Sequence, residues 1–203
     1  MGDLVTYNNI DYYVIKDSDE SEANVTLLKK EPLTVAEVNL YGGVGTENNH
    51  VNHYTTTIQG AAKDSNGYGS MAYYSSSTCG CVNHSIVNTE CTNIYVESDI
   101  KYVVDSWKNA QAPAAIETRL LTTEDLMDNL GYNWQIASSG MPSLNDNVLD
   151  FAYNSKFNQW TMTSYNDSVF MLWLIRYDGN LNATSVYDEA VVRPVIVLSK
   201  SVI

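Results

Sequence analysis

The sequence predicts an α+β domain with short helices, an irregular antiparallel sheet and long loops. The stretch "LVTYNNIDYYVI" alternates apolar and polar residues around an Asn-Asn pair, which is typical of a β-hairpin. Two later stretches, beginning near residues 34 and 98, carry capping residues and helical spacing. Residues 45–97 are rich in Gly, Ser, Thr and Asn and show little periodicity, which predicts loops. We expect one domain over residues 1–203: N-terminal strands and a helix (1–44), a loop-rich insertion (45–97), then helices and C-terminal strands (98–203).

The first elements follow from local patterns. After the hairpin, "NVTLLKKEPL" supplies a third strand, which predicts a β-meander. The acidic segment "KDSDESEA" before that strand lacks the glycine and the terminal Glu of an EF-hand loop, so we expect a solvated hairpin tip there. Thr34 and Glu37 have capping-box spacing, and Gly42-Gly43 follows, which predicts a short helix that ends at the glycines.

The second half contains two further helices. In "SDIKYVVDSWKNA", four apolar side chains share one helical face, with Ser98 or Asp99 as N-cap: Ile100, Val103, Val104 and Trp107. The stretch "TRLLT" predicts a short buried strand. It is followed by a second capped helix from Thr122 to Leu130, which Gly131 ends.

The last sixty or so residues predict strands and loops. The stretch "FMLWLIRY" is expected to alternate between a buried and an exposed face, and "DGN" then supplies a hairpin turn. The apolar stretch "VVRPVIVL" predicts a final strand. Because Pro194 has no N–H, we expect this strand at a sheet edge or in an irregular position.

The charge excludes some partners. The chain carries a formal net charge of −13 and only 11 Lys and Arg residues, whereas nucleic acid and anionic membranes require clustered cations. No apolar run approaches the roughly 20 residues that span a bilayer. The start "MGDLVTYNN" has no signal-peptide pattern, which does not exclude export. A glycan or another protein surface remains the expected kind of partner.

The three cysteines allow three interpretations. A disulfide between Cys79 and Cys91 would stabilise the fold by about 3 kcal/mol and would imply a location outside the cytoplasm, with Cys81 left over. A zinc site from the three thiols and His84 has the wrong spacing for a zinc knuckle, and three buried free thiols are the remaining alternative. His50 and His53 lie in a loop-like stretch. We expect no metal and no cofactor.

Catalytic motifs are missing from the sequence. It contains no G-x-S-x-G, no H-E-x-x-H and no phosphate-binding loop. Asp188 and Glu189 are the first carboxylate pair to consider for glycoside hydrolysis, but neighbouring residues of a strand point to opposite faces. We expect a protein that is not an enzyme.

Ligand binding explains the C-terminal composition better. Tyr, Asn, Asp and Ser are the residues of antibody-type binding surfaces, although they also populate ordinary loops. Here they lie between buried residues such as Trp160 and Trp173, and Arg193 is expected to fix the last strand by pairing with a buried carboxylate or with carbonyls. The predicted ligand-binding residues are Tyr153, Asn154, Tyr165, Asn166, Asp167, Phe170, Arg176, Tyr177, Asp178, Asn180, Asn182, Ser185, Tyr187 and Asp188.

Several stretches together resemble a known family: "YYVIKDSDESEANVTLLKKEPLTVAEVN", "NGYGSMAYYSSSTCG", "DIKYVVDSWKN", "TRLLTTEDL", "WTMT" and "VVRPVIVLSKS". They look like exported, prepilin-associated proteins of Gram-positive gut bacteria. The C-terminal regions of those proteins are similar to the C-type-lectin-like fold of formylglycine-generating-enzyme relatives and of the variable proteins of diversity-generating retroelements. The resemblance implies that fold, two loop cysteines matching Cys79 and Cys91, and a prepilin segment outside these 203 residues. Nothing here matches the catalytic cysteines of formylglycine-generating enzymes.

The resemblance also implies sequence diversification. Randomised adenines of AAY codons never yield Trp, Met, Lys, Gln or Glu, so Trp160, Met162, Met171, Trp173 and Glu189 would be fixed. The candidate exposed and variable positions are Leu172, Leu174, Arg176, Tyr177, Asp178, Asn180, Asn182, Ala183, Thr184, Ser185, Tyr187, Asp188 and Ala190.

The expected function is therefore a ligand-binding domain displayed outside the cell, on a cell surface or pilus. Its partner would be a protein or glycan on another surface. The alternatives are a structural pilin or filament subunit and a phage receptor-binding tip.

Overall fold

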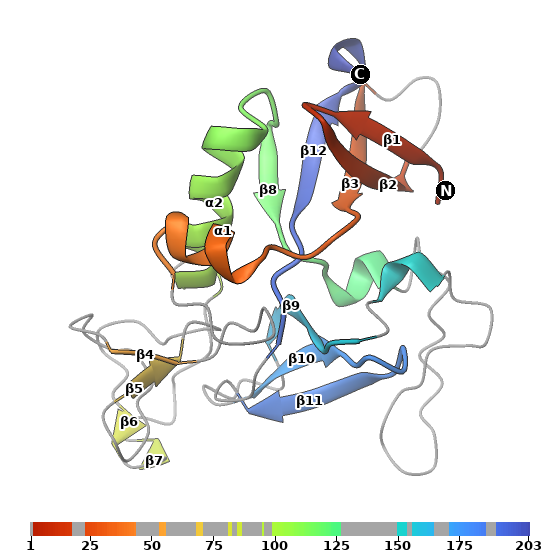
Figure 1. The fold of residues 1–203 in the computed structure, drawn as a ribbon. Coiled ribbons are helices and arrows are strands. Elements are labelled where there is room, and N and C mark those ends of the chain that lie inside the picture. The colour runs from red at the N-terminus through yellow and green to blue at the C-terminus, as the bar shows by residue number, and fades with distance from the viewer. Residues whose placement is uncertain are drawn as a thin grey trace.

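The computed structural model is an α+β structure with mostly antiparallel strands and few helices (Figure 1). Among the described residues, no helix is long and apolar enough to cross a membrane. The residues that the structure describes are 2–17, 23–43, 53–55, 68–70, 81–82, 85–86, 95, 99–126, 150–153, 156–164, 171–185 and 190–203.

The larger sheet has five strands in the order β1-β2-β3-β12-β8. Its strands are β1 (Leu4–Tyr7), β2 (Ile10–Lys16), β3 (Asn24–Lys29), β12 (Val195–Ser199) and β8 (Glu117–Arg119). The predicted meander β1-β2-β3 is confirmed. Its first turn consists of Asn8 and Asn9 at φ values of 49° and 61°, the positive pair that a type I′ hairpin requires.

The prediction for the last strand is confirmed in one part and wrong in the other: Pro194 lies in an irregular stretch before β12, but β12 is not an edge strand. Instead of an edge, β12 occupies the interior of the sheet, antiparallel to both β3 and β8 (Figure 1). Pro194 is compatible with this place because it lies one residue before the strand and needs no ladder N–H there. Its carbonyl accepts a hydrogen bond from the Lys29 N–H at 2.8 Å, so the segment already pairs with the end of β3.

The first helix, α1 (Val35–Leu40), has the predicted capping box. The Thr34 hydroxyl accepts a hydrogen bond from the Glu37 N–H at 3.2 Å, and the Glu37 carboxylate accepts one from the Thr34 N–H at 2.8 Å. Gly42 follows the helix at a φ of 92°, and a β-carbon there would meet the Tyr102 ring at 2.7 Å. The backbone conformation therefore favours glycine here, and any larger residue would also have to displace the exposed Tyr102 ring.

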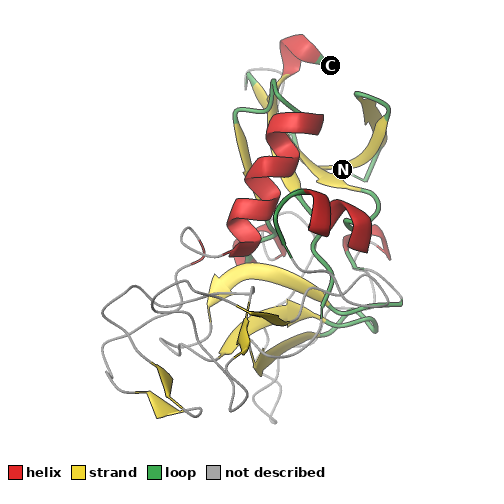
Figure 2. Cartoon of the chain, turned by 60° about the vertical axis from the view of Figure 1, so that its left-hand side comes forward, coloured by secondary structure: helices red, strands yellow, loops and turns green. Residues whose placement is uncertain are grey.

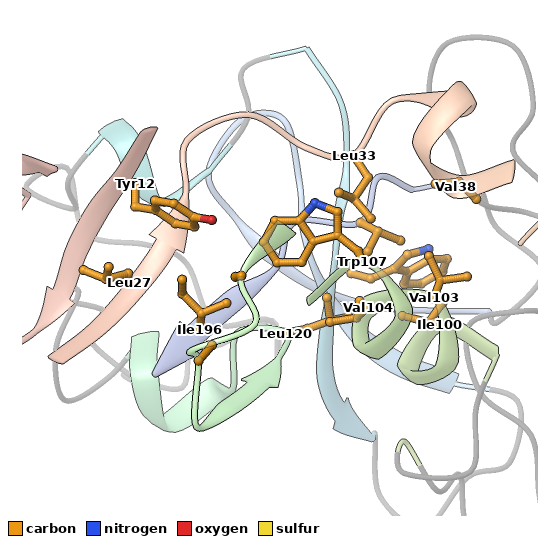
Figure 3. Packing of buried hydrophobic residues seen from close by; sticks show 14 of the residues in the cluster. Tyr12, Leu27, Leu33, Val38, Ile100, Val103, Val104, Trp107, Leu120 and Ile196 are labelled. Carbon is orange, nitrogen blue, oxygen red and sulfur yellow. The ribbon is translucent and has the colours of Figure 1, made fainter. Parts of the chain in front are cut away.

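The second helix, α2 (Asp99–Gln111), covers one face of the sheet. Its four predicted core residues, Ile100, Val103, Val104 and Trp107, are buried in one cluster. Side chains from β2, β3, α1 and β12 complete this first cluster (Figure 3). Asp99 is the first helical residue, and Ser98 lies outside the described residues.

The predicted "TRLLT" strand is shorter than expected, because β8 ends at Arg119 while Leu120 and Leu121 are buried beyond it. Thr122 caps the next helical turn: its hydroxyl accepts a hydrogen bond from the Asp125 N–H at 2.9 Å, and the Asp125 carboxylate accepts one from the Thr122 N–H at 2.8 Å. The description stops at residue 126, so the predicted helix end at Gly131 lies outside it.

The smaller sheet has the order β11-β10-β9 and lies below the larger one in both views (Figures 1 and 2). Its strands are β9 (Gln159–Ser164), β10 (Met171–Ile175) and β11 (Leu181–Ser185). A second cluster joins the two sheets, with Ile15, Leu28 and Val195 from the larger sheet against Trp173, Ile175 and Leu181. A short helix, η4 (Asp150–Ala152), packs at this cluster.

The described side chains of β10, at residues 173–175, are buried on both faces, which corrects the expected alternation. Trp173 and Ile175 belong to the second cluster, whereas Leu174 between them belongs to the first. Leu174 and Ala190 were expected among the exposed, variable positions, yet both are buried. A run of apolar residues without polar ones between them is compatible with a strand buried on both faces, and that is the case here.

The 45–97 insertion is described at two short hairpins and at Tyr95. β4 (His53–Thr55) pairs with β5 (Tyr68–Ser70), and β6 (Cys81–Val82) pairs with β7 (Ser85–Ile86). Cys79 and Cys91 lie outside the described residues, as do His50, His84 and most of the acidic "KDSDESEA" segment. The disulfide therefore stays a prediction.

Candidate functional site

The predicted binding residues that the structure brings together form the turn between β10 and β11. We call Arg176, Tyr177, Asp178, Gly179 and Asn180 the hairpin tip. The Arg176 N–H donates to the Asn180 carbonyl at 2.7 Å, and the Gly179 N–H donates to the Arg176 carbonyl at 2.9 Å. Gly179 has a φ of 80°, which completes the usual three-residue hairpin loop with a left-handed last residue. The predicted "DGN" turn is confirmed.

Side-chain contacts fix the tip further. The Asp178 carboxylate accepts a hydrogen bond from the Asn180 N–H at 3.1 Å and lies 3.4 Å from the Arg176 guanidinium. The same guanidinium lies 5.6 Å from the centre of the Tyr177 ring, within the range of a cation–π contact. The Tyr177 N–H donates to the Asn158 side chain at 3.3 Å, which ties the tip to the segment before β9.

Tyr177 is the exposed aromatic residue of this arrangement, with 49% of its surface accessible. Its backbone is held at a tight turn, and about half of the residue remains open to a partner. An aromatic side chain has few rotatable bonds, so a ring on a fixed backbone loses little conformational entropy when a partner covers it. The tip therefore has the properties of a rigid aromatic contact surrounded by polar groups.

The other predicted binding residues take three kinds of position. Asn182 is half-buried on β11, and Ser185 pairs with Met171 at the far end of that strand. Tyr153 follows η4 and is half-buried against the second cluster, so part of its ring serves packing. The rest lie outside the described residues: Asn154, Tyr165, Asn166, Asp167, Phe170, Tyr187 and Asp188.

The strands that carry the tip contain buried tryptophans. Trp160 and Trp173 are buried, and the Thr161 hydroxyl donates to the Trp173 carbonyl at 2.6 Å across the β9–β10 pair. Asn158 and Thr161 carry contacts that sequence patterns did not indicate. Both contacts depend on the pairing of β9 with β10. This pairing brings Asn158 next to Tyr177, which lies 19 positions later in the chain.

Arg193 lies under the larger sheet rather than at the tip, with 2% of its surface exposed. Its Nε donates to the Lys29 carbonyl at 2.7 Å, so the expected partner is a carbonyl. Its guanidinium lies 6.0 Å from the centre of the Tyr13 ring, and its Nη1 finds no hydrogen-bond partner among the described residues. Burial lowers the pKa of this guanidinium to about 10, so it is charged at neutral pH.

Lys29 is a second buried cation that the sequence did not indicate. Its amine donates to the Glu31 carbonyl at 2.8 Å and to the Pro32 carbonyl at 3.4 Å. Burial lowers the pKa of this amine, partly offset by nearby Glu37. Lys29 and Arg193 together hold the chain where β3 ends and where β12 begins, which is a structural role.

A cleft lies between α2 and β8. This cleft has a volume of about 250 Å³ and contains several cations. Lys101 contacts Asp105 at 2.5 Å, and Arg119 contacts Asp125 and Glu117. Internal carboxylates therefore already pair with Lys101 and Arg119, two of the three cations that line the cleft.

The described side chains form no candidate metal site. Among the residues whose side chains are described, no group of three or more His, Cys, Asp or Glu could hold a metal ion. The cysteines and histidines considered above contribute no described side chain, so the expectation of no metal stays a prediction.

Comparison of the chain with family models, with curated proteins and with solved structures finds no match.

Proposed function

We propose that the chain is a non-enzymatic ligand-binding domain, displayed on a cell surface or pilus, and that the hairpin tip is the centre of its binding face. The partner would be a protein or glycan on another surface. The C-type-lectin-like fold and the retroelement-type diversification are parts of the same proposal.

One observation carries this proposal: Tyr177 is half-exposed on a turn that both backbone and side-chain contacts fix. Arg176 and Asp178 beside it offer charge and hydrogen bonds, and Asn180 and Asn182 continue the polar surface. Exposed aromatics that are rigid before binding dominate the energetics of many interfaces.

The hairpin has two parts with different roles: the buried strand β10 and the exposed tip. The strand residues serve two cores and cannot vary freely, whereas the tip can change without disturbing either cluster. A diversified face would therefore centre on the tip and on Asn182, and would exclude Leu174 and Ala190.

A binding comparison tests the proposal. The labelled domain is applied to an array of defined glycans and to intact bacterial and epithelial cells, as wild type and as Tyr177→Ala. Truncating a central aromatic anchor is expected to weaken binding about 30-fold or more. Tyr102→Ala is the matched control because Tyr102 is an exposed tyrosine on α2, with 63% of its surface accessible.

Both variants should unfold within about 0.5 kcal/mol of the wild type, since exposed positions seldom contribute more. If Tyr177→Ala binds like wild type, or if Tyr102→Ala loses as much, the tip is not the binding centre. A comparison of natural alleles gives a second test. Codon changes should concentrate at the tip, and a uniform spread would contradict diversification.

A further inference from the structure

The hairpin tip contains the only Asp-Gly step of the chain, Asp178-Gly179. An aspartate followed by glycine is the dipeptide most prone to intramolecular cyclisation, because glycine has no side chain to hinder the approach of its nitrogen to the carboxyl group. The step lies in the turn that joins β10 to β11 (Figure 1), and the Asp178 side chain is 34% exposed. The tip therefore carries a position of the main chain that can react with itself.

The reaction conserves atoms and needs no reagent other than water. The Gly179 nitrogen attacks the Asp178 carboxyl carbon and loses its proton, and the carboxyl group releases one oxygen as water, which closes a succinimide ring. Water then opens the ring at either carbonyl. Attack at the former side-chain carbonyl restores aspartate, whereas attack at the backbone carbonyl gives isoaspartate. The product has an unchanged mass and an additional methylene in its main chain.

The folded tip keeps the two reacting atoms apart. A three-residue hairpin loop contains a type I turn, whose third residue, here Asp178, adopts a ψ of about 0°. At this angle the Gly179 nitrogen is turned toward the Asp178 nitrogen and away from the carboxyl group. Ring closure requires rotation about the Asp178 Cα–C bond, which breaks the hydrogen bond from the Gly179 N–H to the Arg176 carbonyl, 2.9 Å long. Gly179 is also buried, whereas Asp178 is exposed.

Arg176 contacts both reacting groups. Its carbonyl accepts the hydrogen bond from Gly179, and its guanidinium lies 3.4 Å from the Asp178 carboxylate. The carboxylate also accepts a hydrogen bond from the Asn180 N–H at 3.1 Å. The guanidinium itself lies 5.6 Å from the centre of the Tyr177 ring, a second contact that restrains it. Cyclisation therefore has to break contacts of the carboxylate as well as the hydrogen bond of Gly179.

We infer that Asp178-Gly179 is a site of aspartate isomerisation and that Arg176 keeps this site closed in the folded chain. The inference does not rest on the proposed binding function, because the reaction requires no ligand. Isoaspartate at this position lengthens the main chain of the turn and moves the carboxylate, so the hydrogen bonds of Gly179 and Asn180 are both lost. The modification therefore changes the position of Tyr177.

Isoaspartate formation in the folded and unfolded chain tests the site. The full chain is incubated at mildly acidic pH, with and without urea, and fragmentation mass spectrometry locates isoaspartate by the additional methylene in the main chain. In urea, Asp178 should isomerise faster than any other aspartate. In the folded chain its rate should be at least about tenfold lower, because the contacts of the tip must open first.

Equal rates at Asp178 in the folded and unfolded chain would overturn the inference, as would another aspartate that reacts first in urea. Asn66 also precedes a glycine, and its deamidation produces isoaspartate as well. That product lies in a different tryptic peptide, so the two positions are measured separately.

A pair of variants tests the role of Arg176. Arg176→Gln should raise the rate at Asp178 about threefold in the folded chain, since it removes an exposed ion pair. Lys30→Gln is the matched control: it removes the same charge from the pair with Asp11, and Lys30 is 36% exposed against 38% for Arg176. The control should isomerise at Asp178 like wild type. An unchanged rate in Arg176→Gln, or an equal rise in Lys30→Gln, would refute the role of Arg176.

Two further readouts separate the tip from other causes. In urea, Arg176→Gln should match wild type, because the unfolded chain lacks the contact. Asp105 serves as an internal reference for global unfolding, since it precedes Ser106 on α2 and pairs with Lys101 at 2.5 Å. Its rate in folded Arg176→Gln should equal that of wild type. A rise in urea, or a parallel rise at Asp105, would show that Arg176 does not act through the folded tip.

Discussion

Strand β10 and the hairpin tip are adjacent in sequence and occupy opposite environments. Trp173, Leu174 and Ile175 contribute to two separate cores, one on each face of the strand. The next residues, Arg176, Tyr177 and Asp178, contact mainly one another, the turn backbone and Asn158. We therefore expect the tolerance to substitution to change abruptly at Arg176. The buried strand holds the tip in place, so the tip can be both exposed and ordered.

The largest expected effect comes from substituting a polar residue type of the tip, asparagine, at a buried position of β10. Asn is a permitted substitution under AAY diversification, yet Leu174→Asn should lower the free energy of unfolding by about 3 to 5 kcal/mol, because it removes buried apolar surface and buries an amide. Urea unfolding followed by Trp fluorescence measures this. Arg176→Asn at the tip is the control and should cost less than about 1 kcal/mol. Similar losses in both variants would refute the division of the hairpin.

A smaller effect is expected at Arg193, which supports the larger sheet. Arg193→Ala should destabilise by about 3 kcal/mol, because it leaves the Lys29 carbonyl without its partner and opens a cavity. Arg193→Met keeps much of the volume and removes a buried charge that forms no ion pair with a described carboxylate, although Glu31 acts on it electrostatically, so it should cost about 1 kcal/mol. Denaturant titration distinguishes the two. If Met is as costly as Ala, the charge itself stabilises the fold.

The smallest effect belongs to the turn itself. Gly179→Ala should cost about 1 kcal/mol, since Gly179 adopts a φ of 80° that alanine disfavours. Thermal unfolding measures this loss. Because the turn orients Tyr177, the same variant should also bind more weakly to whatever surface the wild type recognises. Unchanged binding would show that orientation of the tip does not matter.

The predictable parts of the structure are those with a local cause. The Asn8-Asn9 turn, the Thr34–Glu37 capping box, the buried face of α2 and the "DGN" turn all depend on neighbouring residues, and the sequence predicts each of them. Similarly, the residue types of the tip indicate an exposed, polar-aromatic surface.

The predictions that were wrong or missing concern contacts between residues that are distant in sequence. The double burial of Leu174 follows from two clusters that only the assembled sheets create, and the interior position of β12 follows from strand order. Likewise, Lys29 was not singled out, because the carbonyls that receive its amine are placed by the chain's path after β3. Local patterns do not encode such long-range pairings.

The interior position of β12 has a consequence for the order of folding. Its neighbour β3 lies near the start of the chain, and the contact between Arg193 and Lys29 spans 164 positions. A chain synthesised from its N-terminus can form the β1–β2–β3 meander early, but β3 has no inner neighbour until residues 195–199 arrive. Closing so long a loop is slow. The sheet is therefore completed late, and until then the nascent chain presents an unpaired β3 to whatever machinery handles it.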